Sequence, residues 1–212
     1  MKHRTQKLSL LLVAVIVACG LIVTGAVGLW ETLNHPEART ALDMRGDSVE
    51  LDPGEVPVPA ASSRAVPDTG DRLIVSSVGL DVPIGALDAV GGQITPPGFT
   101  SAYVVRNMGV DLADGEEGTV FLVMHSLRNG AVGPGNYLAD VTTRRSKLAI
   151  GASVEAAGHR YTVTGSQLVP KASIAENATV WANTPRRLLL ITCLERADGT
   201  PSTQNLIITA TG

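Results

Sequence analysis

Two residues near the ends of apolar stretches could carry out nucleophilic chemistry. Cys193 closes the stretch 188–193, and His125 lies at the end of another, 118–126. An imidazole beside a thiol can take its proton for attack on a carbonyl and can later protonate a leaving amine. With reference pKa values near 8.5 and 6.5, about 3% of an unperturbed thiol is thiolate at pH 7, and a nearby positive charge raises that fraction. The two residues predict a cysteine nucleophile served by a histidine. The alternative is an inert, buried Cys193, and the stretch alone leaves it open.

Short apolar stretches separated by turns predict the elements that must position these two residues. Gly (22 residues) and Pro (12 residues) are frequent and aromatic residues make up only 3%, which favours a turn-rich β architecture over a helical bundle. We expect a mainly β domain, a closed or nearly closed barrel of about seven to eight short strands. The predicted strands cover 72–80, 82–87, 101–107, 118–126, a pair over 146–170, 188–194 and 205–212, with a short helical piece over 137–145.

The N-terminal segment predicts a membrane anchor. Residues 1–7 carry three basic side chains and no acid, and 8–29 contain no charged residue. A helix of that length reaches roughly 33 Å, enough for a hydrocarbon core of about 30 Å, and the positive-inside rule leaves 1–7 in the cytoplasm. A cleaved signal peptide and a lipoprotein signal with a lipidated Cys19 are the alternatives. All three place the remainder outside the membrane. We expect 30–70 to be a Pro-rich extracellular linker and 71–212 to be the barrel domain.

Composition argues against several classes of partner and cofactor. The net charge of −3 and the pI near 5.8 argue against a nucleic-acid partner. The other histidines (His3, His35 and His159) form no spaced set with the cysteines, so we expect no metal and no other cofactor. The acidic stretch 111–118 lacks the spacing of a calcium loop and is predicted to be a solvated turn.

Several pieces of the sequence, in order between Leu73 and Gly212, resemble the sortases, the membrane-anchored cysteine transpeptidases of Gram-positive cell surfaces. VFLVMHS (120–126) resembles the family's histidine-bearing strand, and LLLITC (188–193) resembles the signature that bears the nucleophile. The remaining pieces are VPIGAL (82–87), the proline loop 96–103 with Ala102-Tyr103, and LVPK with VW (168–171 and 180–181), which resembles the actinobacterial class F group. Met124 and Leu189 depart from the pattern, because the family usually has Gly and Thr there.

The resemblance implies a reaction and a set of site residues. Cys193 would attack the Thr carbonyl of an LPxTG-like sorting signal, and His125 would protonate the departing Gly amine. A cell-wall amine, or water, would then resolve the thioester. The family also places an Arg at the start of the last strand to hold the oxyanion, and this chain has none there. Arg196 is the candidate replacement, with Asn205 as its alternative, and Thr192 and Asn205 are expected to contact the substrate.

Two further possibilities stay open for the missing Arg. Gln204 or Arg128 could donate to the oxyanion instead, or the chain could have lost catalysis. In that last case the protein would be a non-catalytic surface binding module that kept the sortase-like barrel.

Overall fold

The computed structural model describes residues 41–49 and 59–212, which belong to one compact unit, Ala41–Gly212. The predicted cytoplasmic tail 1–7, the predicted membrane-spanning segment 8–29 and part of the predicted linker lie outside the described residues. Within the described part of the chain, no helix combines the length and the apolar character needed to cross a membrane.

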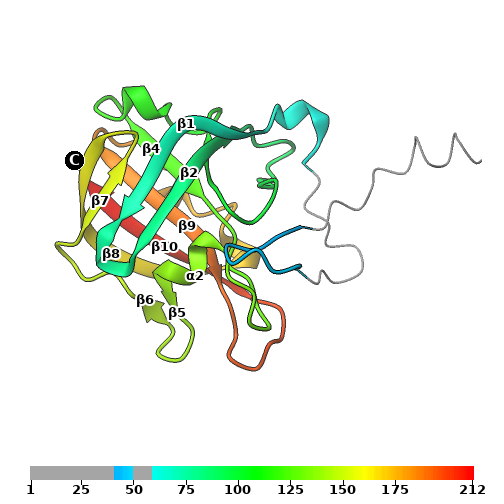
Figure 1. The fold of residues 1–212 in the computed structure, drawn as a ribbon. Coiled ribbons are helices and arrows are strands. Elements are labelled where there is room, and N and C mark those ends of the chain that lie inside the picture. The colour runs from blue at the N-terminus through cyan, green and yellow to red at the C-terminus, as the bar shows by residue number, and fades with distance from the viewer. Residues whose placement is uncertain (1–40, 50–58) are drawn as a thin grey trace, which may run out of the picture. The chain divides into compact units, whose positions relative to one another are not determined.

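A closed barrel of eight strands forms the body of the molecule, in the order β1-β2-β3-β4-β9-β10-β8-β7 (Figure 1). The predicted mainly β barrel is therefore confirmed. Two neighbouring pairs, β2–β3 and β4–β9, are parallel, and the other pairs are antiparallel. The strands are β1 (Val66–Val75), β2 (Leu80–Leu87), β3 (Ala102–Val105), β4 (Thr119–Val123), β7 (Ser153–Ala156), β8 (His159–Pro170), β9 (Arg187–Leu194) and β10 (Gln204–Thr211).

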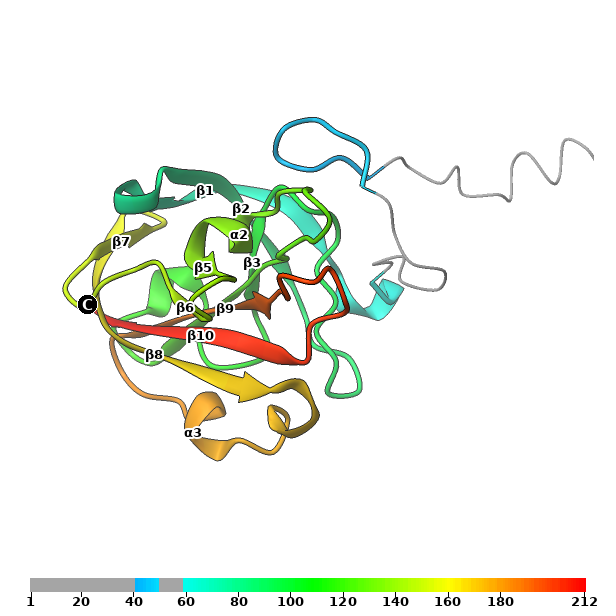
Figure 2. The same cartoon turned by 90° about the horizontal axis from the view of Figure 1, so that it is seen from below.

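The elements outside the barrel are short. They are the helices α2 (Pro134–Leu138) and α3 (Ala178–Trp181), a hairpin of β5 (Ala139–Asp140) and β6 (Arg145–Ser146), and single 3-10 turns at Ala61–Ser63, Ser76–Val78, Leu112–Asp114 and Lys171–Ser173. In Figure 1, α2 lies at the end of the barrel where β9 ends and β10 begins. Figure 2 shows α3 outside the barrel, below β8.

Two details of the strand and helix predictions were wrong. The expected strand 72–80 is interrupted by the 3-10 turn Ser76–Val78. The expected helical piece 137–145 is helical only up to Leu138, and the β5–β6 hairpin follows. The Asp140 carboxylate accepts hydrogen bonds from the backbone N–H groups of Thr142 and Thr143, which is turn chemistry that competes with a helix.

The barrel wall separates two hydrophobic clusters, because successive side chains of a strand point to opposite faces. On β4 and β9 the inner cluster takes Leu122, Leu188 and Leu190, and the outer cluster takes Phe121, Val123, Leu189 and Ile191. The α3 helix covers the outer cluster, to which it contributes Val180 and Trp181. The same alternation puts Cys193 of β9 on the outer face, and continuing it past the end of β4 puts His125 there too.

A short N-terminal hairpin packs against the loop that follows β4. Asp43 is 2% exposed, and its carboxylate accepts hydrogen bonds from the N–H groups of Arg45, Asp47 and Val132 at 2.7, 3.0 and 2.9 Å. In return, the N–H of Met44 donates to the carbonyl of Val132 at 2.8 Å. Ordered contacts with the barrel unit thus begin well before the predicted domain start at residue 71.

Candidate active site

The parallel pairing of β4 with β9 brings the two predicted catalytic residues together. The register runs to Val123 opposite Ile191, and the N–H of Met124 donates to the carbonyl of Ile191 at 3.0 Å. Continuing this register two residues past the end of β4 places His125 opposite Cys193 of β9. Neighbouring strands are about 4.8 Å apart, so the imidazole and the thiol start from adjacent positions on one face.

A buried hydroxyl pair ties these two strand ends together. The Oγ of Ser126 and the Oγ1 of Thr192 are hydrogen-bonded at 3.0 Å, and both residues are buried. Ser126 follows His125 and Thr192 precedes Cys193, so this bond links the two strand ends immediately beside the candidate catalytic residues. Thr192 is only 2% exposed and belongs to the inner face. Its placement favours a role in holding the strands together over the substrate contact that the sequence suggested.

The start of α2 packs directly against this hydroxyl pair. The N–H of Gly135 donates to the carbonyl of His125 at 2.9 Å. A Cβ at Gly135 would lie 1.9 Å from the Oγ1 of Thr192 and 2.4 Å from the Oγ of Ser126. Only glycine fits here, because the backbone of α2 packs directly against the Ser126–Thr192 hydrogen bond.

His125 is enclosed by the proline loop that precedes β3. Its Nε2 is 3.0 Å from the carbonyl oxygen of Pro96, and the ring of Phe99 meets it edge-on, with centroids 5.0 Å apart at 68°. A carbonyl only accepts, so Nε2 carries the proton in the neutral ring and Nδ1 is its acceptor atom. Tyr103 holds this loop in place by donating its hydroxyl hydrogen to the carbonyl of Pro97.

The pKa of His125 lies below its ordinary value of 6.5. Burial is the main cause, because it disfavours the charged ring, and the positive charge of Lys171 adds to the effect. The bond to Pro96 acts in the opposite direction and does not outweigh them. The imidazole is therefore neutral at pH 7 and can act as a base.

Cys193 is partly buried, and its cross-strand neighbour on β10 is Asn205. Residues paired directly across antiparallel strands share a face of the sheet, so Asn205 and Cys193 lie on the same side of the barrel wall. Among the proposed replacements for the missing arginine, Asn205 is thus the one that the register places beside the thiol. Gln204 pairs with Leu194, and its side chain accepts a hydrogen bond from Arg144.

The structure places Arg196 in the exposed loop between β9 and β10. Its guanidinium forms an ion pair with Asp198 at 2.9 Å, and 43% of its side chain is exposed. Arg128, the other arginine considered from the sequence, lies in the loop after β4, where it lines a pocket.

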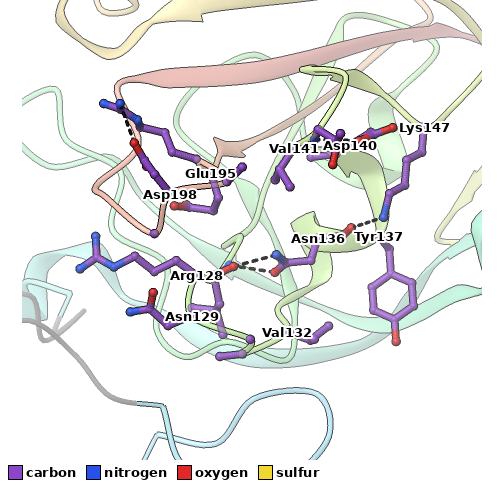
Figure 3. Close-up of a pocket in the computed structure, with 18 of the residues that line it drawn as sticks. Arg128, Asn129, Val132, Asn136, Tyr137, Asp140, Val141, Lys147, Glu195 and Asp198 are labelled. Carbon is purple, nitrogen blue, oxygen red and sulfur yellow. Dashed lines mark hydrogen bonds and ion pairs between the residues drawn. The ribbon is translucent and has the colours of Figure 1, made fainter.

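That pocket is a feature that the sequence did not reveal. It has a volume of about 990 Å³, and it lies between the loop after β4, the α2–β5 segment and the β9–β10 loop. Figure 3 shows Glu195 and Asp198 on one side of it and Asn136, Tyr137 and Lys147 on the other. Glu195, two residues after Cys193, lines the pocket, so the pocket adjoins the segment that follows the candidate nucleophile. Its walls come from loops far apart in the sequence, so no local pattern marks it.

Within the described residues, no group of three or more His, Cys, Asp and Glu side chains could hold a metal ion.

Comparison with known proteins finds likeness only at the level of the fold. No family model and no curated protein matches the chain. Among solved structures, sortase A of Listeria monocytogenes has a TM-score of 0.46 and 19% identity, covering 66% of this chain and 84% of that one. Sortase C-1 of Actinomyces oris has a TM-score of 0.46 and 16% identity, covering 66% and 71%. Sortase D5 of Clostridium perfringens has a TM-score of 0.45 and 13% identity, covering 66% and 76%. The likeness spans several sortase classes and assigns neither a class nor an activity to this chain.

Proposed function

We propose that this protein is a sortase-type cysteine transpeptidase that cleaves an LPxTG-like sorting signal between Thr and Gly. The observation that carries the proposal is the β4–β9 register, which sets His125 beside Cys193 on one face of the barrel. The sequence pieces around both residues resemble those of the sortases in order and spacing. The actinobacterial class F group is the class that LVPK and VW favour.

The reaction follows from the chemistry of the pair. The Cys193 thiolate attacks the Thr carbonyl, and His125, having taken the thiol proton, gives it to the departing Gly amine. The bond from sulfur to the acyl carbon forms as the peptide C–N bond breaks, which leaves a thioester. An amine on a cell-wall precursor, or water, then attacks the thioester and regenerates the thiol.

The pocket beside the site is the route that we propose for the amine acceptor. It borders the residues that follow His125 and Cys193, and three of its lining residues, Asp140, Glu195 and Asp198, carry carboxylates that suit an ammonium group. Arg45, Arg128, Lys147 and Arg196 also line it, so a zwitterionic or mixed-charge acceptor fits this lining better than a simple diamine.

The cellular setting that we propose comes from the sequence alone. The uncharged segment 8–29 would cross the membrane once, with residues 1–7 in the cytoplasm and the barrel domain outside. Surface proteins that bear sorting signals would then meet the site on the outer side of the membrane.

A peptide-transfer assay tests the proposed function. The full chain is incubated with LPxTG-type peptides, with and without an amine acceptor, and cleavage and transfer products are separated by mass spectrometry. We expect cleavage after Thr and transfer to the amine, with both lost in Cys193→Ala and in His125→Ala. Full cleavage by Cys193→Ala would rule out the mechanism.

The competing function is a non-catalytic binding module, and the neutral Asn205 opposite Cys193 is the observation that favours it. That alternative predicts peptide binding without cleavage, together with a Cys193 that reacts with alkylating agents no faster than an ordinary thiol.

A further inference from the structure

Lys171, just past the end of β8, is held close to the start of β10, the strand that pairs with the end of β9 that bears Cys193. Pro170, the last residue of β8, pairs with Gln204, and the N–H of Lys171 donates to the carbonyl of Thr203 at 2.9 Å. The Oγ of Ser173 donates to the carbonyl of Pro170 at 3.3 Å and closes the turn. The backbone of Lys171 is thus held against the segment that enters β10.

The strand register relates this lysine to the thiol. Val169, Asn205 and Cys193 form one cross-strand row over β8, β10 and β9, and Val169 belongs to the outer hydrophobic cluster. Val169 and Cys193 lie two strand spacings apart, roughly 10 Å, and Lys171 lies two residues beyond Val169, just past the end of β8. The flexible side chain of a lysine, with its four-carbon stem, can extend from there across the start of β10 toward the thiol.

The charge of Lys171 already acts on the site. Of the two influences that lower the pKa of His125, burial is the larger, and the field of Lys171 is the charge–charge contribution. Two arginines near the site are engaged with other groups: Arg196 pairs with Asp198, and Arg144 donates to Gln204. The ammonium of Lys171 is exposed, and its field reaches the imidazole.

We propose that Lys171 supplies the positive charge that stabilises the Cys193 thiolate and the oxyanion formed when that thiolate attacks a carbonyl. In the step, the sulfur lone pair forms the S–C bond and the carbonyl π electrons move to oxygen. The ammonium of Lys171 donates a hydrogen bond to this oxygen. When the oxyanion collapses, the C–N bond breaks, and the amine leaves with the proton held by His125. No proton passes to or from Lys171 in this step. The oxyanion part of this inference rests on the proposed function; the thiolate part does not.

The first test measures the thiol without any substrate. The full chain is alkylated with iodoacetamide between pH 5 and pH 9, and the Cys193 peptide is followed by mass spectrometry, which separates it from Cys19. Removal of the charge in Lys171→Gln raises the pKa of the thiol, and we expect alkylation at pH 7 to slow by about fivefold. Lys171→Arg should restore the rate. The matched control is Arg160→Gln, which removes one exposed charge at the other end of β8.

The second test measures turnover of the sorting peptide. Loss of one oxyanion donor typically lowers kcat by about 100-fold, so we expect Lys171→Gln to lose kcat to this extent with KM little changed. A wild-type alkylation rate and kcat in Lys171→Gln would overturn the inference and leave the proposed function standing. A rise in KM alone would also overturn it, because Lys171 would then bind a carboxylate on the substrate. If the wild-type chain cleaves no peptide but Lys171→Gln still slows alkylation, the proposed function fails and the thiolate role of Lys171 stands.

Discussion

Gly135 offers the sharpest test of how the site is held together. Its Cα faces the bonded hydroxyls of Ser126 and Thr192, and an added Cβ would lie 1.9 Å from the Oγ1 and 2.8 Å from the Cβ of Thr192. Thr192 is β-branched and buried within a central strand, so it cannot turn away cheaply. Gly135→Ala must therefore push β9 away from α2, and with it the residue that precedes Cys193.

The expected cost combines three effects of different sign. Overpacking a close-packed interior costs about 1–3 kcal/mol. Loss of the Ser126–Thr192 bond leaves buried hydroxyls unpaired and costs about 1–3 kcal/mol more. The better helix propensity of Ala returns at most about 1 kcal/mol. We expect a net loss of about 3 kcal/mol in the free energy of unfolding, or about 6–12 °C in Tm for a domain of this size.

Denaturant unfolding of the full chain measures this cost, and Cys193 alkylation measures the damage to the site. Gly165→Ala is the matched control, because a Cβ at Gly165 meets nothing within 4 Å and glycine weakens strand interiors. We expect Gly165→Ala to be neutral or slightly stabilising and to leave alkylation unchanged. If Gly135→Ala unfolds within about 0.5 kcal/mol of wild type and alkylates normally, the close contact that we describe is not a constraint.

Three further outcomes follow from the same structure. Phe99→Ala removes a 3%-exposed ring from the face of His125, so we expect it to cost about 3–5 kcal/mol and to move the pKa of His125 up toward 6.5 by admitting water, as NMR titration of the ring would show. The pKa of His125 is lower in the folded chain, so the unfolded chain binds the proton more readily, and stability falls as pH drops from 6.5 toward the folded pKa. Denaturant unfolding at pH 5 and pH 7.5 should therefore show a smaller difference in the free energy of unfolding for His125→Gln than for wild type. At Asp43 burial raises the pKa of the carboxyl, but the N–H donors of Val132, Asp47 and Arg45 and the charge of Arg45 outweigh burial, so the folded pKa is lowered. The stabilisation from the hairpin contacts is therefore fully present above the ordinary pKa of 3.8 and is lost as pH falls through the lowered pKa. Asp43→Asn should speed hydrogen exchange at the Val132 amide already at pH 7.

The fold was predictable because its signals are local. Barrel strands such as β3, β4 and β9 are short apolar runs next to Gly, Pro or charge, and the runs ending near His125 and Cys193 are among the most apolar in the chain. The failed helix at 137–145 shows the limit of this reasoning, since the turn made by Asp140 competes with helix formation over a span too short for periodicity to decide.

The arrangement of the site was less predictable because it depends on which strands are neighbours. No local pattern says that β4 runs parallel to β9, although that register sets His125 beside Cys193. The same holds for Lys171, which reaches the site because β8 pairs with β10 and β10 pairs with β9. Arg196 was the expected cation because it lies close to Cys193 in the chain, but the structure pairs it with Asp198.

The Asp43 hairpin was missed for a different reason. Composition marked 30–70 as a linker, and a single buried carboxylate that collects backbone donors leaves almost no trace in composition. That carboxylate becomes buried only when the loop containing Val132 folds against it.

The central claim is that Cys193 forms a covalent acyl intermediate with a sorting peptide. It is tested most directly by the intact mass of the full chain after brief incubation with LPxTG-type peptides and an acid quench, which preserves a thioester. We expect a mass increase equal to the peptide up to its Thr, located on Cys193 by fragmentation and absent in Cys193→Ala. An increase that persists in Cys193→Ala, or cleavage by wild type with no adduct under any quench, would contradict it.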